Sequence, residues 1–273
     1  MQKITFFFVF ILATLFVGCE DVVDVDLNTA PPKLVIEASI NWQKGTSGNQ
    51  QRIKLTTTTD YFSTNIPKVS GAIVTITNST NTVFNFVEVP NTGEYFCSNF
   101  VPVINETYTL TVVSKGQTYT ATETLQPVAP ITKLEQKNDG GITGDEIEVK
   151  TFYNDPAGIP NYYLYKYTYS NQVKSNLYVD RDEFFVVIEL FSISQNDELK
   201  KGDTIEISHY GISKAYYNYM SILVSIAGNN GGGPFQSPPA TVRGNIINTT
   251  DKANYPLGYF SLSEIDFRSY TIQ

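Results

Sequence analysis

The residues that could carry out chemistry are few and lie far apart in the chain. There is one histidine, His209, so a metal site or a Ser–His–Asp triad built on imidazole would have to include it. It lies in an alternating stretch beside Ser208 and Tyr210, with no ligand or nucleophile pattern around it. We therefore expect His209 to be a structural or surface residue. We predict no catalytic residue, no metal site and no cofactor.

Carboxylates offer the other possible chemistry, as cation ligands or as acid–base pairs. An acidic cluster within residues 139–148 surrounds glycines but misses the regular calcium-loop spacing, which favours a solvated loop over a calcium site. Asp155 begins a turn with Pro156, which presets φ. Asp182 and Glu183 precede a Phe-rich stretch, and charge at an exposed strand edge explains the pair. The members of the cluster are Asp139, Asp145, Glu146 and Glu148.

A glycine-rich run at residues 231–233 is the most conspicuous loop. A phosphate-binding loop would need Lys and then Ser or Thr at the start of a helix, whereas these glycines are followed by Pro238 and Pro239. Binding residues often lie on loops held by a rigid scaffold. We therefore predict that this loop contacts a ligand or partner through Gly231, Pro234, Phe235 and Pro238.

The N-terminus predicts export. Lys3 is followed by an apolar or small run from Ile4 to Gly18, shorter than the roughly 20 residues of a membrane-spanning helix. The run predicts a signal peptide over 1–18. Residues 16–19 (Phe-Val-Gly-Cys) resemble a bacterial lipobox, with Leu15 one place early, which implies that Cys19 is lipidated. The alternative is an ordinary signal peptide with a chance cysteine.

An acidic tether is predicted over residues 19–31. Glu20 and Asp21 begin a stretch that resembles the surface-export signal of Bacteroidota lipoproteins. The alternative is a solvated tether whose acidic residues have no role in export. Removal of Lys3 with the signal peptide leaves 18 basic against 27 acidic residues, a net charge of −9. That charge argues against a nucleic-acid partner. Only Cys97 then remains besides Cys19, and we expect it to be a buried small hydrophobic residue.

The fold that must position these residues is mainly β. Residues 32–127 alternate in period two and are broken by Gly, Asn and Pro, which predicts an antiparallel β-sandwich. The order VSGAIVTI, GEYFC, ETYTLTV, GQTYTATETL resembles prealbumin-like and Ig-like sandwiches. Pro127 and Pro130 predict a stiff linker over 126–131.

Residues 128–273 predict a second, antiparallel β-rich domain with one packed α-helix. Strands are expected at 146–153, 162–169, 176–179, 184–191, 204–209, 241–247 and 259–262, and a polar loop at 137–145. Between Ser213 and Ala227 the apolar residues recur every three or four positions, which predicts the helix, with Ser213 as its cap and Gly228 at its end. Its wide apolar stripe indicates packing onto a sheet.

Four stretches together resemble one family. They are CEDVVDVDL at Cys19, PKLVIEASIN at Pro32, FYNDPAGIPNYYLYK at Phe152, and GGGPFQSPPATVRGNIIN at Gly231 with LGYFSLS at Leu257. The combination is similar to the Bacteroidota lipoprotein family described as the domain of unknown function DUF4249. The resemblance implies an accessory lipoprotein of a TonB-dependent outer-membrane receptor, since genes of the two commonly lie together. It carries over no catalytic residues.

The sequence thus predicts a non-enzymatic, surface-exposed outer-membrane lipoprotein that helps a TonB-dependent transporter to capture or admit a ligand. Its partners would be the outer membrane, through the lipid anchor, and the transporter. Two alternatives stay open. One is a structural or adhesive surface protein that assembles through exposed strands, and the other is a glycan hydrolase that uses carboxylates alone.

Overall fold

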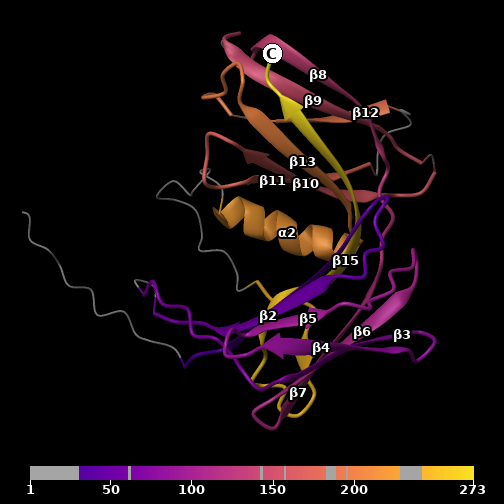
Figure 1. The fold of residues 1–273 in the computed structure, drawn as a ribbon, viewed down its shortest axis with the longest axis vertical. Coiled ribbons are helices and arrows are strands. Elements are labelled where there is room, and N and C mark those ends of the chain that lie inside the picture. Colours follow the sequence, from indigo (N-terminus) through magenta and orange to yellow (C-terminus); the bar gives the residue numbers. More distant parts are fainter. Residues whose placement is uncertain are drawn as a thin grey trace, which may run out of the picture. The chain divides into compact units, whose positions relative to one another are not determined.

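A computed structural model describes residues 31–60, 63–141, 144–156, 158–182, 189–194, 196–227 and 242–273. Several predictions fall outside these residues. They are the signal peptide over 1–18, almost all of the tether with Cys19, Glu20 and Asp21, Glu183 with most of the strand expected at 184–191, the helix end at Gly228, and the loop residues Gly231, Pro234, Phe235 and Pro238. Within the described part, the protein is mainly β, as predicted (Figure 1).

The N-terminal half forms an Ig-like sandwich. In β1 (Leu34–Gln43), Ile36, Ala38 and Ile40 are buried and the residues between them are exposed, so one face enters the core. The same alternation recurs in β4 (Val83–Val89) and β6 (Thr107–Ser114). The strands of the predicted antiparallel sandwich are confirmed. The remaining strands are β2 (Gln51–Thr57), β3 (Ile73–Asn78), β5 (Glu94–Cys97) and β7 (Gln117–Thr124).

The C-terminal half has a second core between two sheets. One sheet has the order β12-β9-β8, and the facing strands β11, β10, β13 and β15 belong to the large twelve-stranded sheet. The core contains Tyr163, Tyr165, Tyr167 and Tyr169, which lie on one face of β10. The bounds are β8 (Ile131–Gly140), β9 (Glu146–Asn154), β10 (Tyr162–Tyr169), β11 (Asn176–Arg181), β12 (Glu189–Ile193), β13 (Thr204–Gly211), β14 (Ile247–Asn248) and β15 (Leu257–Thr271).

Strand β15 joins the two cores. Its residues Leu257–Ile265 pair in parallel with β1, and Ile265–Thr271 pair antiparallel with β13, so one strand runs from the sandwich into the second sheet (Figure 1). Residues Pro32–Gln273 form one compact unit. The division into domains at residue 127 stays a prediction.

The predicted linker over 126–131 is wrong, because this segment is docked along β15. Val128 and Ile131 are buried, and their amide groups donate to the carboxylates of Glu264 and Asp266, at 2.9 and 2.6 Å. Gln126 pairs with Ser263, and β8 begins at Ile131. The two prolines stiffen the chain, but buried carboxylates opposite the amides hold it in place.

The predicted helix is confirmed as α2 (Lys214–Ala227). The Ser213 hydroxyl accepts a hydrogen bond from the amide of Tyr216 at 3.2 Å, which caps the first turn. Met220 packs with Tyr162 and Leu164, on the face of β10 opposite the buried tyrosines. Among the described residues, no helix has both the length and the apolar character needed to cross a membrane.

Candidate functional site

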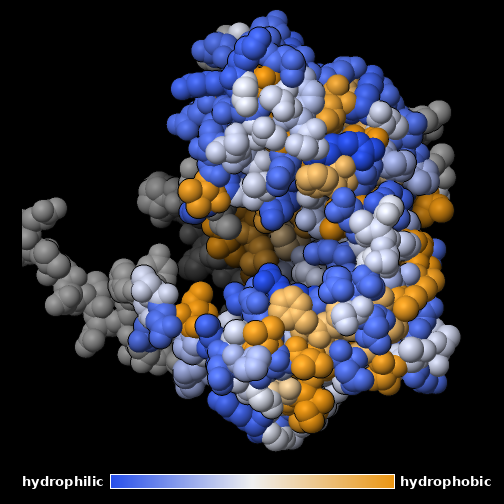
Figure 2. Space-filling model, viewed as in Figure 1, coloured by the Kyte–Doolittle hydropathy of each residue, from blue (hydrophilic) through white to orange (hydrophobic). Residues whose placement is uncertain are grey.

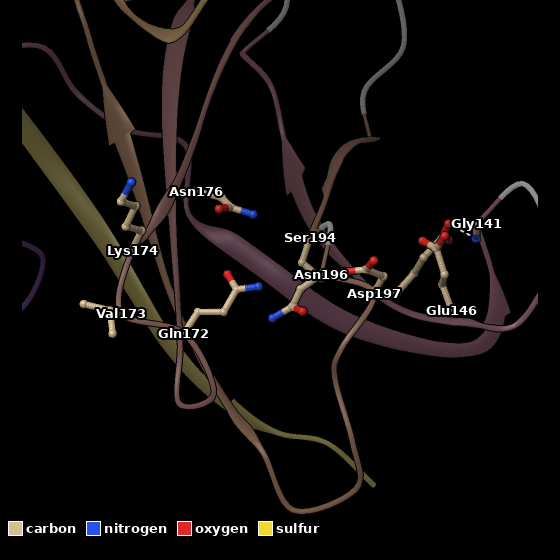
Figure 3. A pocket seen from close by; sticks show the side chains of 10 residues that line it. Gly141, Glu146, Gln172, Val173, Lys174, Asn176, Ser194, Asn196 and Asp197 are labelled. Atoms are coloured by element: carbon tan, nitrogen blue, oxygen red, sulfur yellow. Dashed lines mark hydrogen bonds between the residues drawn. The ribbon is translucent and has the colours of Figure 1, made fainter. Parts of the chain in front are cut away.

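A pocket of about 760 Å³ opens at one end of the C-terminal half (Figure 3). Three segments distant in sequence line it: the end of the β8–β9 hairpin, the β10–β11 loop and the residues after β12. We call it the polar groove. Its lining residues are Gly141, Glu146, Glu148, Gln172, Val173, Lys174, Asn176, Ser194, Asn196 and Asp197.

One wall of the polar groove is fixed by hydrogen bonds. Ser194 is fully buried and accepts a bond from the amide of Val149 at 3.1 Å. Asn196 is buried, donates to Asn171 at 3.0 Å and accepts from the amide of Glu198 at 2.9 Å. These bonds leave the wall rigid, so its polar atoms are positioned before a ligand arrives.

The opposite wall carries adaptable polar groups. In Figure 3 the amides of Gln172 and Asn176 point toward Ser194 and Asn196, whereas Val173 projects away from the groove. Carboxylates and amides together provide acceptors and donors for a polar ligand. The lining has three carboxylates and one lysine, so the groove is polar and net acidic.

Two members of the acidic cluster, Glu146 and Glu148, line this groove, whereas Asp139 and Asp145 are exposed, as expected of a solvated loop. Glu146 and Glu148 are residues of β9, and the Glu148 carboxylate accepts a hydrogen bond from the amide of Gly141 at 2.8 Å. The predicted loop at 137–145 is shortened because β8 extends to Gly140 through a register shift. The described residues contain no group of three or more His, Cys, Asp or Glu side chains placed to hold a metal ion.

His209 is a core residue. It is fully buried, with its ring 4.4 Å from that of Tyr165 in a stacked arrangement and 4.7 Å from that of Tyr163. Burial lowers the pKa of His209 to about 3, so the imidazole is neutral at neutral pH. The structural expectation for His209 is confirmed. Cys97 is buried, also as expected.

A carboxyl pair, the half-buried Asp155 and the buried Asp182, is the feature that sequence reasoning missed. Asp155 accepts a hydrogen bond from the Tyr163 hydroxyl at 2.6 Å, and Asp182 accepts one from the amide of Asn161 at 2.6 Å. The neighbouring Asp182 carboxyl also favours the protonated form of Asp155, which raises the pKa of Asp155. Asp182 is buried, so its assignment to an exposed strand edge is wrong. No local signal marks the pair, because its members lie far apart in sequence.

The pair lies at the end of β9 opposite the polar groove. Asp155 follows Glu146 by nine positions, or roughly 30 Å of extended strand. A glycosidase needs its two carboxyl groups at least about 5 Å apart across a substrate. A carboxyl group beside a second one, as Asp155 is beside Asp182, instead favours its own protonated form.

The carboxyl pair predicts a pH-dependent stability. Burial, and then the neighbouring Asp182 carboxyl, raise the pKa of Asp155 to about 6, above the ordinary value of 3.8. The native state therefore holds this proton more tightly, and the resulting stability is lost as the pH rises through 6. Asp155→Asn should not lose it. The native chain should therefore lose about 1 kcal/mol more of its free energy of unfolding between about pH 5 and pH 7.5 than Asp155→Asn does, after allowance for solvent screening.

Urea unfolding at the two pH values measures this gain. Asp60→Asn is the control, because Asp60 is exposed in a loop. A constant difference between Asp155→Asn and the native chain across this range would show that the native state does not favour the protonated form of Asp155.

The sandwich exposes a row of apolar side chains on its outer face. Val87 of β4 pairs with Phe96 of β5, and the β3–β4 register places Ile73 beside Val87. Their exposed fractions are 70%, 41% and 65%. Figure 2 shows hydrophobic residues gathered over these strands. We call Ile73, Val87 and Phe96 the apolar row; such contiguous exposed groups often mark protein contacts.

Comparisons with known proteins give a family. The model of a family described as domain of unknown function (DUF4249) matches residues 20–268. No protein with a curated description matches the chain.

Three solved structures are similar at low identity. A DUF4785 family protein from Legionella pneumophila is 9% identical, with 67% of this chain and 54% of that chain covered and a TM-score of 0.27, so the chain spans about half its length. A two-domain fibronectin type-III segment of chicken tenascin is 12% identical (66% and 90% covered, TM-score 0.22). A cytokine receptor complex is 8% identical (68% and 86% covered, TM-score 0.25).

Proposed function

Because the chain belongs to the DUF4249 family, we propose that it is a non-enzymatic lipoprotein on the outer-membrane surface that captures a ligand for a TonB-dependent transporter. The observation that carries the proposal is the presence of two separate surfaces, the polar groove and the apolar row. A capture subunit needs one surface for its ligand and another for its partner.

The polar groove suits the ligand. Its volume of about 760 Å³ lies in the range of small-molecule sites, and its walls offer donors and acceptors. Its open mouth suits capture and release. The lipobox resemblance at Cys19 and the acidic residues after it support anchoring and export.

The apolar row suits the transporter. Apolar groups at the centre of a protein interface contribute much of the binding free energy, because they lose contact with water. The double variant Ile73→Thr, Val87→Thr keeps β-branched side chains and removes apolar surface. We expect it to reduce by about tenfold the transporter that co-purifies with the tagged lipoprotein in mild detergent, measured by quantitative mass spectrometry.

Ile159→Thr is the matched control, since Ile159 is 64% exposed and lies outside the apolar row. It should leave the recovery of the transporter unchanged. Recovery of the lipoprotein alone, or of its own multimers, from the native strain would contradict the proposal and favour the adhesive alternative. Cleavage of glycans by the purified chain would favour the hydrolase.

A further inference from the structure

Two cations converge on one aromatic ring where the predicted tether meets the sandwich. The Lys33 ammonium lies 3.2 Å from the centroid of the Tyr255 ring, and the Arg243 guanidinium carbon lies 4.0 Å from it. Hydrogen bonding to Lys33 is the main cause of a lowered pKa at Tyr255, with Arg243 adding to it. The three residues precede β1, β14 and β15, so tertiary structure brings them together.

The backbone on both sides of this cluster is held firmly. The amide of Lys33 donates to the Thr58 hydroxyl at 2.9 Å, and the Thr58 amide returns a bond to the Lys33 carbonyl at 2.9 Å. Asn245, two residues after Arg243, bonds both the carbonyl and the amide of Phe260, at 2.8 and 2.9 Å. The two cations are therefore positioned by β1 and β15.

These cations have no acidic partner in the described part of the chain. Neither Lys33 nor Arg243 lies within 4.0 Å of a carboxylate there, whereas Lys44, Arg52 and Arg268 do. This is unusual for a chain whose net charge is −8. The ring contacts one side of each cation and leaves further N–H donors available.

We propose that Lys33, Arg243 and Tyr255 form a binding site for the phosphate groups of the membrane surface. An ammonium and a guanidinium together match the charge and the several acceptors of a phosphate. Tyrosine suits a membrane interface because its ring is apolar and its hydroxyl is polar. This inference rests on the proposed lipidation of Cys19.

The tether explains why the occupant would be a membrane. Only 13 residues separate Cys19 from Lys33, so a lipidated Cys19 would keep Lys33 within reach of the headgroups. Each cation alone binds an anionic surface only weakly, but the tether supplies a high effective concentration. An anionic membrane repels the rest of the acidic protein and attracts the two cations. The site would therefore turn this part of the anchored protein toward the membrane.

Amine acetylation read by mass spectrometry tests the proposal. The full lipoprotein is reconstituted into vesicles of phosphatidylethanolamine, with or without phosphatidylglycerol. We expect phosphatidylglycerol to slow acetylation of Lys33 by about fivefold, and about 0.5 M salt to restore it. Lys115, exposed at the β6–β7 turn, is the internal control. Arg243→Gln should remove most of the protection, whereas Lys252→Gln should not.

Two results would overturn the proposal. One is an equal rate of Lys33 acetylation on vesicles with and without phosphatidylglycerol, when flotation shows that the protein is anchored to both. The other is equal protection by inorganic phosphate in detergent, which would assign the site to a soluble anion. Flotation tests lipidation and co-purification tests the transporter, so a failure of the proposed function is distinguishable from a failure of this site.

Discussion

Gly258→Ala is expected to lower the free energy of unfolding by roughly 3 to 5 kcal/mol. Gly258 lies in β15 with φ +94°, and a Cβ there would lie 2.1 Å from the carbonyl oxygen of Ile36 in the paired strand β1. The oxygen is a backbone atom and the position of the Cβ is fixed by the backbone of β15, so relief would require β1 and β15 to separate. The strain of positive φ adds about 1 to 2 kcal/mol.

Gly202→Ala separates these two causes. Gly202 has φ +95°, but a Cβ there would meet nothing within 4 Å. It should therefore lose only the 1 to 2 kcal/mol of conformational strain. Thermal unfolding followed by circular dichroism should place the midpoint of Gly258→Ala roughly 5 to 10 °C below that of Gly202→Ala. Equal midpoints would show that β1 and β15 approach each other less closely than described.

The strands that sequence reasoning placed best have a strong local signal. Residues Tyr162–Tyr169 were expected as a strand and form β10 with the same bounds, because a run of aromatic residues favours extended structure. The sequence did not predict which faces of β10 are covered. Tyr163 faces the second core and Tyr162 faces α2, so the run lacks the alternation that would reveal one buried face.

Strand β15 shows why the full architecture was harder to predict. Only residues 259–262 were expected as a strand, whereas β15 spans Leu257–Thr271. Ser263, Glu264 and Asp266 interrupt the apolar pattern and suggest a surface. They are buried because their partners come from distant segments, among them Lys44, Val128 and Ile131. In a sequence, a buried polar residue with a distant partner cannot be told from an exposed polar residue, because the partner is brought to it only by the tertiary fold.

The polar groove was predictable only in part. The acidic cluster drew attention to Glu146 and Glu148, which do line it. The amides of Gln172 and Asn176 gave no signal, because only the tertiary structure places them in the same groove as Ser194. Neither periodicity nor spacing reports which loops meet across the ends of a sandwich.

Asp266→Ala is expected to lower the free energy of unfolding by about 2 to 4 kcal/mol. Its carboxylate accepts bonds from the Ile131 amide and from Arg268, both at 2.6 Å, and its side chain is only 6% exposed. Alanine would leave the amide of Ile131 unsatisfied inside the protein and Arg268 without its acidic partner. Urea unfolding measures the loss, and hydrogen exchange should show faster opening at Val128 and Ile131.

Glu94→Ala is the matched control, because Glu94 also pairs with an arginine, Arg52, at 3.1 Å. Both of these side chains are substantially exposed, at 31% and 57%, and exposed pairs contribute about 1 kcal/mol or less. Equal losses for the two variants would mean that the connector at 126–131 does not depend on Asp266. A larger loss for Asp266→Ala, with faster exchange confined to this connector, would establish that a buried carboxylate of β15 holds the two cores together.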